Sequence, residues 1–388
     1  MGRVKRLWPV AALCFFALFL TGCTALIEGH PRLVVTPHEI EPPSHYPEDY
    51  IEVATQDELE QAIWYMIEHH VETGLFRMTD REIVVTDVID AVLQEPLGAF
   101  AARIITPQIL SEQHGFVEVE LSISFQKTAE QVAGVRSIQS PASAAAFLER
   151  MLRDGDTYLA MQIPAHMADV AVFAGVLRDF YYNHALEVVL LPDIETSLYP
   201  GSDSGTQRIA ELRLYFGFDP ATLSQMRADL QYAAHRLRQD MPEDLETVYD
   251  QVVWLATTLS DRTERVFDSG EPWNPLYDTA FGTLVTGTAA SEGFAMAMLA
   301  LFELLGLDAM VVQGNLAEVP HAWNLVEIDG YFYHVDVYRL HELGPQYALF
   351  VPDELMLFEL DYSWDATLYP RADGPFRYEE ILPENGEY

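Results

Sequence analysis

Cysteine is the scarcest informative residue in this chain, because the 388 residues contain only Cys14 and Cys23. Cys14 lies inside an apolar run, residues 7–20, that follows a basic head. This run is shorter than the ~20 apolar residues of a membrane-spanning helix and is typical of a signal peptide that is removed on export. The mature chain would then keep Cys23 alone, which excludes a disulfide and a thiolate zinc site.

The segment around Cys23 predicts a lipid anchor. Residues 20–23 read Leu-Thr-Gly-Cys, which resembles the bacterial lipobox. The resemblance implies a signal peptide over residues 1–22 and lipid, such as palmitate, attached to Cys23, so that no thiol remains as a nucleophile. An uncleaved anchor helix is the alternative. In both cases we expect an extracytoplasmic protein whose partner is the membrane, with the proline-rich residues 23–51 as a tether.

Positive charge is also scarce. The chain has 22 Lys and Arg against 60 Asp and Glu, a formal net charge of −38. Nucleic acid should be repelled by such a chain, so nucleic-acid binding is excluded as a function. The acidic residues are spread along the sequence without a D-x-D-x-D-G loop, so we expect no calcium site, no other metal site and no cofactor.

The region from residue 52 to residue 218 shows the same order of patterns twice. Helical and strand periodicities follow as α-β-α-β-β in residues 52–130 and again in residues 137–218. Two copies of a small α+β module are the simplest interpretation, with folded structure beginning near Gln56. Chance similarity of two α+β stretches stays open, because the copies share little identity.

Residues 219–388 predict a different, more helical domain. Two helices lead into it, and Pro242 is expected to open the second at its first turn. A buried helix is then predicted from Ser291 to a stop at Gly306. Two apolar strands joined by an Asp-Gly turn follow, with His321 near the start of the first and Asp336 in the second.

This order resembles the transglutaminase-like branch of the papain-like fold, over residues 245–365. The run TLVTGTAASEGFAMAM is similar to the segment around the nucleophile of that family, and HAWNLVEIDGYFYHVDV is similar to its histidine and aspartate segment. The resemblance implies an α+β fold, a helix packed on an antiparallel sheet, with a catalytic triad at Ser291, His321 and Asp336. It departs at the nucleophile, where the family has cysteine and this chain has Ser291.

Several interpretations of that site stay open. We expect a site without cysteine-dependent activity, a pseudoenzyme cleft that binds an envelope protein or peptide, with Trp323, Asn324 and Tyr333 as binding residues. A serine nucleophile acting on amides through His321 and Asp336 is the alternative. The third possibility is a structural spacer. For Ser291, the simpler interpretation is a helix N-cap.

Overall fold

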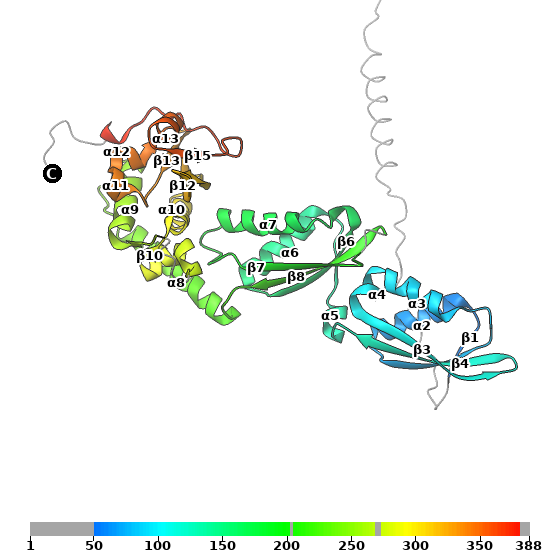
Figure 1. Cartoon of the computed structure of the whole chain (residues 1–388). Coiled ribbons are helices and arrows are strands. Elements are labelled where there is room, and N and C mark those ends of the chain that lie inside the picture. Colours follow the sequence, from blue (N-terminus) through cyan, green and yellow to red (C-terminus); the bar gives the residue numbers. More distant parts are fainter. Residues whose placement is uncertain (1–49, 202–204, 268–272, 381–388) are drawn as a thin grey trace, which may run out of the picture.

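The computed structural model describes residues 50–201, 205–267 and 273–380, which form two small α+β units followed by a larger C-terminal part (Figure 1). The predicted signal peptide, Cys23 and nearly all of the predicted tether lie outside the described residues. Among the residues that are described, no helix has the length and apolar character needed to cross a membrane.

The first unit, module 1, is a four-stranded sheet in the order β1-β2-β4-β3 with helices along one face (Figure 1). Its elements are β1 (Ile51–Val53), α2 (Gln56–Glu68), β2 (Thr73–Met78), α3 (Val85–Gln94), α4 (Pro96–Ala101), β3 (Ala102–Gln113) and β4 (Phe116–Phe125). Folded structure therefore begins five residues before the predicted start at Gln56, because β1 pairs in parallel with β2 at the edge of the sheet.

The second unit, module 2, repeats this topology. A short helix, α5 (Ala129–Ala133), leads to it, and its sheet has the order β5-β6-β8-β7. Its elements are β5 (Arg136–Ser137), α6 (Pro141–Asp154), β6 (Tyr158–Pro164), η1 (Ala165–Met167), α7 (Val170–Asn183), β7 (Asp193–Tyr199) and β8 (Gln207–Tyr215). In both modules the first strand pairs in parallel and the other pairings are antiparallel. Each module thus contains a short first strand that the sequence patterns did not indicate.

Helix boundaries in module 2 follow from capping residues. The hydroxyl of Ser140 accepts a hydrogen bond from the Ser143 amide, and Pro141 occupies the first helical position of α6, where a missing N–H costs nothing. Gly155 ends α6 with φ 73°, a left-handed conformation that side chains other than glycine rarely adopt. These caps set the limits of α6 at Pro141 and Asp154.

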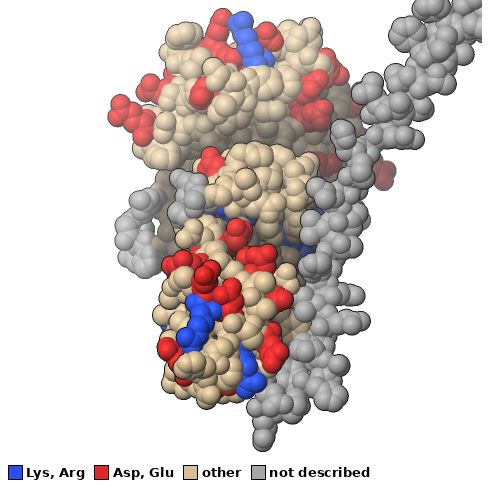
Figure 2. Space-filling model, turned by 90° about the vertical axis from the view of Figure 1, so that its right-hand side faces the viewer, with Lys and Arg blue, Asp and Glu red and all other residues tan. Residues whose placement is uncertain are grey.

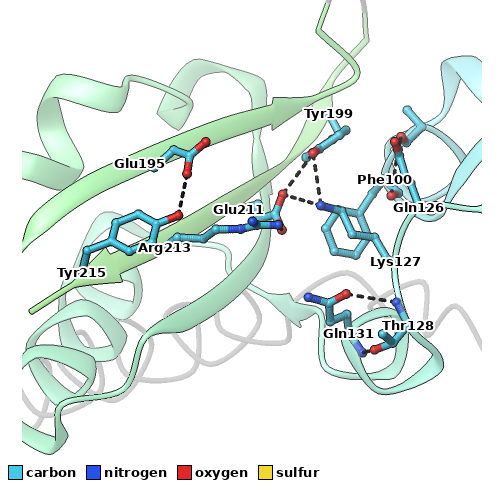
Figure 3. Close-up of polar contacts among 11 residues, drawn as sticks. Phe100, Gln126, Lys127, Thr128, Gln131, Glu195, Tyr199, Glu211, Arg213 and Tyr215 are labelled. Carbon is cyan, nitrogen blue, oxygen red and sulfur yellow. Dashed lines mark hydrogen bonds and ion pairs between the residues drawn. The ribbon is translucent and has the colours of Figure 1, made fainter. Parts of the chain in front are cut away.

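A small buried junction joins the two modules (Figure 3). The ammonium of Lys127, in the segment after β4, lies 2.5 Å from the Glu211 carboxylate on β8 and donates to the Tyr199 hydroxyl at 3.2 Å. The rings of Phe100 and Tyr199 lie 5.1 and 5.0 Å from the same ammonium. Arg213 donates to the other Glu211 oxygen at 3.0 Å. Module 1 therefore meets module 2 through a buried ion pair and the rings of Phe100 and Tyr199.

The C-terminal part is a five-stranded antiparallel sheet with helices packed on it, in the strand order β14-β13-β12-β11-β15. Its helices are α8 (Pro220–Gln239), α9 (Val248–Arg262), η2 (Pro275–Asp278), η3 (Gly282–Thr286), α10 (Ser291–Leu305), α11 (Leu340–Leu343), α12 (Pro345–Ala348), α13 (Asp353–Phe358) and η4 (Tyr378–Glu380). Its strands are β9 (Glu264–Arg265), β10 (Thr288–Ala289), β11 (Ala309–Leu316), β12 (Val319–Ile328), β13 (Tyr331–Val335), β14 (Leu349–Val351) and β15 (Tyr362–Trp364). The helix on an antiparallel sheet that the resemblance predicted is present, and the chain is α+β throughout.

The prediction that Pro242 opens the helix after α8 is wrong. That helix, α9, begins at Val248, and its N-cap is Thr247. The Thr247 hydroxyl accepts from the Asp250 amide while the Asp250 carboxylate accepts from the Thr247 amide, a reciprocal pair that satisfies two free N–H groups. This capping box outweighs the proline signal, so residues 242–247 form a connection.

Module 2 and the C-terminal part share one hydrophobic core. Leu177 of α7, Leu230 of α8 and Phe302 of α10 are all buried in the same cluster, whereas module 1 has a core of its own. The predicted boundary at residues 218 and 219 therefore divides one core. Among the described residues, the two largest buried clusters are therefore the core of module 1 and the core shared by module 2 and the C-terminal part, and a small cluster of Phe100, Ala160 and Ile209 lies beside the Lys127 junction.

Acidic side chains are scattered over the face seen from the module 1 end, among many uncharged residues (Figure 2). Figure 2, viewed from the module 1 end, shows Asp and Glu scattered over that face with few Lys or Arg among them.

Candidate functional site

Ser291 is the first residue of α10, the helix that packs against β11 and β12 of the C-terminal sheet. The N-cap of α10 is Ala290, which makes no side-chain cap hydrogen bond. The hydroxyl oxygen of Ser291 accepts a hydrogen bond from the Ala322 amide of β12 at 3.3 Å. The interpretation of Ser291 as an N-cap is therefore wrong, and its hydroxyl faces the strand that carries His321.

Helix α10 is apolar over almost its whole circumference, because it is enclosed by the sheet, α8, α9 and η2. All residues from Gly293 to Phe302 are buried. Gly293 permits this enclosure: a Cβ there would lie 2.3 Å from the Tyr277 carbonyl oxygen. Asn324 also fixes the helix to β12, since its amide donates to the Ala295 carbonyl at 2.9 Å. Ser291 is therefore held at a rigid helix terminus.

The hairpin of β12 and β13 brings His321 and Asp336 together. Its turn residues Asp329 and Gly330 have φ values of 55° and 81°, as a two-residue hairpin with this Asp-Gly sequence requires. Asp336 directly follows β13, one residue beyond the strand in which it was predicted. The Nε2 atom of His321 lies 2.6 Å from an Asp336 carboxylate oxygen. The predicted His-Asp pair is thus formed.

Two further groups hold the Asp336 carboxylate. The Tyr362 hydroxyl donates to it at 2.6 Å, and the Arg339 amide donates at 3.1 Å. Burial would raise the pKa of Asp336, but the imidazole charge of His321 and these hydrogen bonds lower it below its usual value. The carboxylate therefore stays ionised and can fix the orientation of the imidazole. Tyr362 carries no sequence signal that could have assigned it this role, because it lies 26 residues farther on.

Ser291 and His321 are neighbours without a direct hydrogen bond. Across residues 50–201, 205–267 and 273–380, the Ser291 hydroxyl has Ala322 as its hydrogen-bond partner, and His321 is bonded through Nε2 to Asp336. Because Nε2 faces Asp336, Nδ1 is the imidazole nitrogen left for a base. A serine nucleophile needs a base aligned with its hydroxyl, and that alignment is absent from this conformation.

The prediction that Trp323, Asn324 and Tyr333 contact a ligand is wrong, because each is 1% exposed. Trp323 lies on the sheet face opposite α10, Asn324 is bonded to α10, and the Tyr333 hydroxyl faces Tyr249. Strand alternation alone could not tell which of these side chains faced solvent, since both faces of this sheet are covered.

A second histidine and aspartate pair lies behind the first. The Trp323 indole donates to His334 Nδ1 at 2.9 Å, and His334 Nε2 lies 2.9 Å from Asp353. Burial lowers the pKa of His334, so the ring is neutral and its Nε2–H donates to Asp353. The Trp323 ring is stacked beside His321 at 6.0 Å. This pair fixes the ring that flanks the predicted base.

A cleft of about 1000 Å³ opens at Ser291. Ser291, His321 and Ala322 lie in its wall, and its rim carries the exposed apolar side chains of Phe267, Trp273 and Val319. The lining has five carboxylates against one arginine: Asp278, Glu292, Glu342, Glu359, Asp361 and Arg339. Because Arg339 is paired with Glu342 at 2.7 Å, the other carboxylates give the cleft a net negative charge.

Two of the cleft carboxylates are Asp278, at the end of η2, and Glu292, which directly follows Ser291 on α10. Burial raises the pKa of both, and the charge of Asp278 raises that of Glu292 further. Trp273 donates to Asp278 at 2.6 Å and Tyr182 of α7 donates to Glu292 at 2.5 Å. Sequence reasoning did not identify either carboxylate, although Glu292 directly follows Ser291. No group of three metal-ligating side chains occurs in the part of the chain that the structure describes.

Comparisons with known proteins found similar solved structures but no matching family. No family model and no curated protein matches the chain. One solved structure, described as a TGase, is 16% identical, with 62% of this chain and 63% of that chain covered and a TM-score of 0.26. A second, described as a candidate cysteine protease from Cytophaga hutchinsonii, is 17% identical, with 45% and 68% covered and a TM-score of 0.25. The chain spans less than two thirds of the length of the first structure. The arrangement of a helix on an antiparallel sheet is seen in the elements of this chain itself.

Proposed function

We propose that the chain is a membrane-anchored extracytoplasmic lipoprotein whose C-terminal, transglutaminase-like part binds a protein or peptide of the cell envelope. The observation that carries the proposal is an open cleft whose nucleophile position holds the Ser291 hydroxyl, bonded to a backbone amide instead of to His321. A hydroxyl is far less acidic than a thiol, so the resting ion pair of a cysteine enzyme cannot form. Binding is then the function that the cleft can still perform.

The charge of the cleft supports a ligand with basic side chains. Carboxylates that lack an arginine or lysine partner attract cations, and the apolar rim can receive neighbouring apolar side chains. An extended peptide that alternates basic and apolar residues fits both features. Binding of such a peptide should weaken as ionic strength rises, because the cleft is open to solvent.

Fluorescence anisotropy with two labelled decapeptides tests this proposal. One alternates lysine and leucine, the other glutamate and leucine, and we expect binding of the first only. Glu359→Lys, in the cleft, should weaken binding about tenfold or more, a change of ~1.4 kcal/mol. Glu354→Lys makes the same charge change outside the cleft and serves as the matched control. Equal affinity for both peptides, or equal effects of both variants, would contradict binding in the cleft and favour a structural spacer.

A serine amide hydrolase is the second candidate, favoured by the 2.6 Å contact between His321 and Asp336. In that reaction His321 Nδ1 would take the Ser291 proton as the hydroxyl attacks the amide carbonyl, and would return it to the leaving amine. A fluorophosphonate probe that labels the protein, but not Ser291→Ala, would establish it. Absence of labelling in the folded protein argues for binding without chemistry.

The lipid anchor has its own test. Metabolic labelling with palmitate should mark the protein in a bacterial host, and Cys23→Ala should abolish the label and release the chain from the membrane fraction. Cys14→Ala is the matched control, because that cysteine lies within the predicted signal peptide and should leave the label unchanged. Membrane retention of unlabelled Cys23→Ala would instead indicate an uncleaved anchor helix.

A further inference from the structure

We propose that module 2 positions the cleft wall next to Ser291 through Tyr182 of α7, although the residues that line the cleft in the described structure all belong to the C-terminal part. This inference rests on the proposed function in one respect, that the cleft around Ser291 is the working site. It goes beyond it by making module 2 a support of that site instead of a spacer between the site and the membrane.

Tyr182 connects two cleft residues that lie far apart in the sequence. Its hydroxyl donates to the Glu292 carboxylate on α10 at 2.5 Å and accepts a hydrogen bond from the side-chain amide of Gln313 on β11. Both Glu292 and Gln313 line the cleft. A single hydroxyl from module 2 therefore sets the positions of side chains on two elements of the C-terminal part.

The neighbouring residues of α7 reinforce the contact. The buried Tyr181 hydroxyl donates to the backbone carbonyl of Asp278, a third cleft residue, at 3.3 Å. Two residues beyond α7, the Ala185 amide donates to the Glu303 carboxylate in the last turns of α10 at 3.1 Å. Residues 181–185 thus contact the C-terminal part at both ends of α10. The shared core makes this contact rigid enough to position a side chain.

The hydroxyl of Tyr182 also controls the charge beside Ser291. Burial and the nearby Asp278 raise the pKa of Glu292, while the hydrogen bond from Tyr182 and the more distant charge of Arg178 lower it. Arg178 lies on the same helix as Tyr182 and makes no ion pair with Glu292 within 4 Å in the described structure. Removal of the hydroxyl should therefore raise the pKa of Glu292 further and free its carboxylate from the hydrogen bond that fixes it.

A thiol at position 291 can report this change. In the full chain carrying Ser291→Cys, with Cys14→Ser and Cys23→Ser, position 291 holds the single thiol. Its alkylation by iodoacetamide, measured against pH, gives the apparent pKa of the thiol. We expect Tyr182→Phe to shift that pKa by about 0.5 unit or more, because the Glu292 carboxylate next to position 291 loses the hydrogen bond that fixes it. Glu292→Gln should lower that pKa, because it removes a negative charge that repels the thiolate.

Tyr215→Phe is the matched control, since it removes a hydroxyl that donates to Glu195 at 2.7 Å in the same module but away from the cleft. If Tyr182→Phe fails to fold by circular dichroism, Gln313→Met, an exposed site, removes the other partner of the same hydroxyl and should move the profile the same way. A profile that does not move, or that moves no more than in Tyr215→Phe, overturns the assignment. The thiol reports on the cleft wall whether or not the peptide binds, so failure of the proposed function would be seen separately.

Discussion

Replacement of Lys127 by methionine should weaken the junction between module 1 and module 2 while leaving the C-terminal site intact. The Lys127 and Glu211 side chains are 6% and 3% exposed, and their charged atoms lie 2.5 Å apart. Removing one partner of such a buried pair typically costs ~3–5 kcal/mol, because the other charge remains buried without compensation. Arg213 and Tyr199 still donate to Glu211 in this variant, so we expect the lower end of that range, ~3 kcal/mol.

Hydrogen exchange measured by mass spectrometry can resolve this effect by segment. A loss of ~3 kcal/mol corresponds to an increase of about 150-fold in the open population of the junction. Faster exchange should be confined to residues near Phe100 and Lys127, with α10 unchanged, because the core of module 1 is separate from the core that contains α10.

The ion pair of Lys127 and Glu211 should also weaken in acid. Burial raises the pKa of Glu211, but the hydrogen bond from Lys127 and those from its other donors outweigh burial and lower it, so its contribution is present at neutral pH and lost as pH falls through the lowered value.

The double variant Lys127→Met with Glu211→Leu is the control for this reasoning. Replacing both members of a buried pair by apolar side chains is often neutral, so the double variant should recover most of the protection lost in Lys127→Met. Exchange in Lys127→Met that equals wild type, or a double variant worse than the sum of the single changes, would show that the pair does not hold the junction.

Three further perturbations test the site. Gly293→Ala should lower stability by ~1–3 kcal/mol in urea unfolding, because its Cβ would lie 2.3 Å from the Tyr277 carbonyl oxygen; Gly175→Ala, in α7 with open space around the new Cβ, should be neutral or stabilising. Trp323→Phe should cost at least ~1–3 kcal/mol in the same assay, because it leaves the buried His334 Nδ1 without its donor, and an unchanged midpoint would contradict that role. Asp336→Asn should be less stable than wild type at pH 7. This difference in stability should narrow as pH falls below the usual aspartate pKa of ~3.9, because the stabilisation from the lowered pKa of Asp336 is lost as pH falls through that lowered value. A difference in melting temperature that stays constant with pH would refute this role.

The sequence predicted most of what depends on local signals. The limits of α10 and the Asp-Gly hairpin follow from periodicity, a glycine stop and turn chemistry, and the structure confirms them. The contact between His321 and Asp336, which the family resemblance implied, is also present. What it missed depends on long-range packing. Trp323 and Tyr333 were assigned to binding because alternation along a strand does not reveal that both faces are covered.

The same limit explains the site residues that were not found. Tyr182 and Tyr362 lie 110 and 26 residues from the carboxylates that they contact, and neither lies in a motif. Residues at such separations come together only through the fold, so a single sequence offers no signal for them. The Pro242 error has a different cause, because a correct local rule was overridden by a stronger capping pair five residues later.

The continuous core of module 2 and the C-terminal part has a practical consequence for dissecting the protein. A fragment starting at Asp219 would lose α6 and α7, leaving the apolar sides of Leu230 and Phe302 without part of their cover. Such a fragment should aggregate or bind chaperones instead of folding as an autonomous catalytic or binding unit. By contrast, shortening the chain from its amino end through module 1 removes a body with its own core, and the remainder should still melt in one cooperative transition.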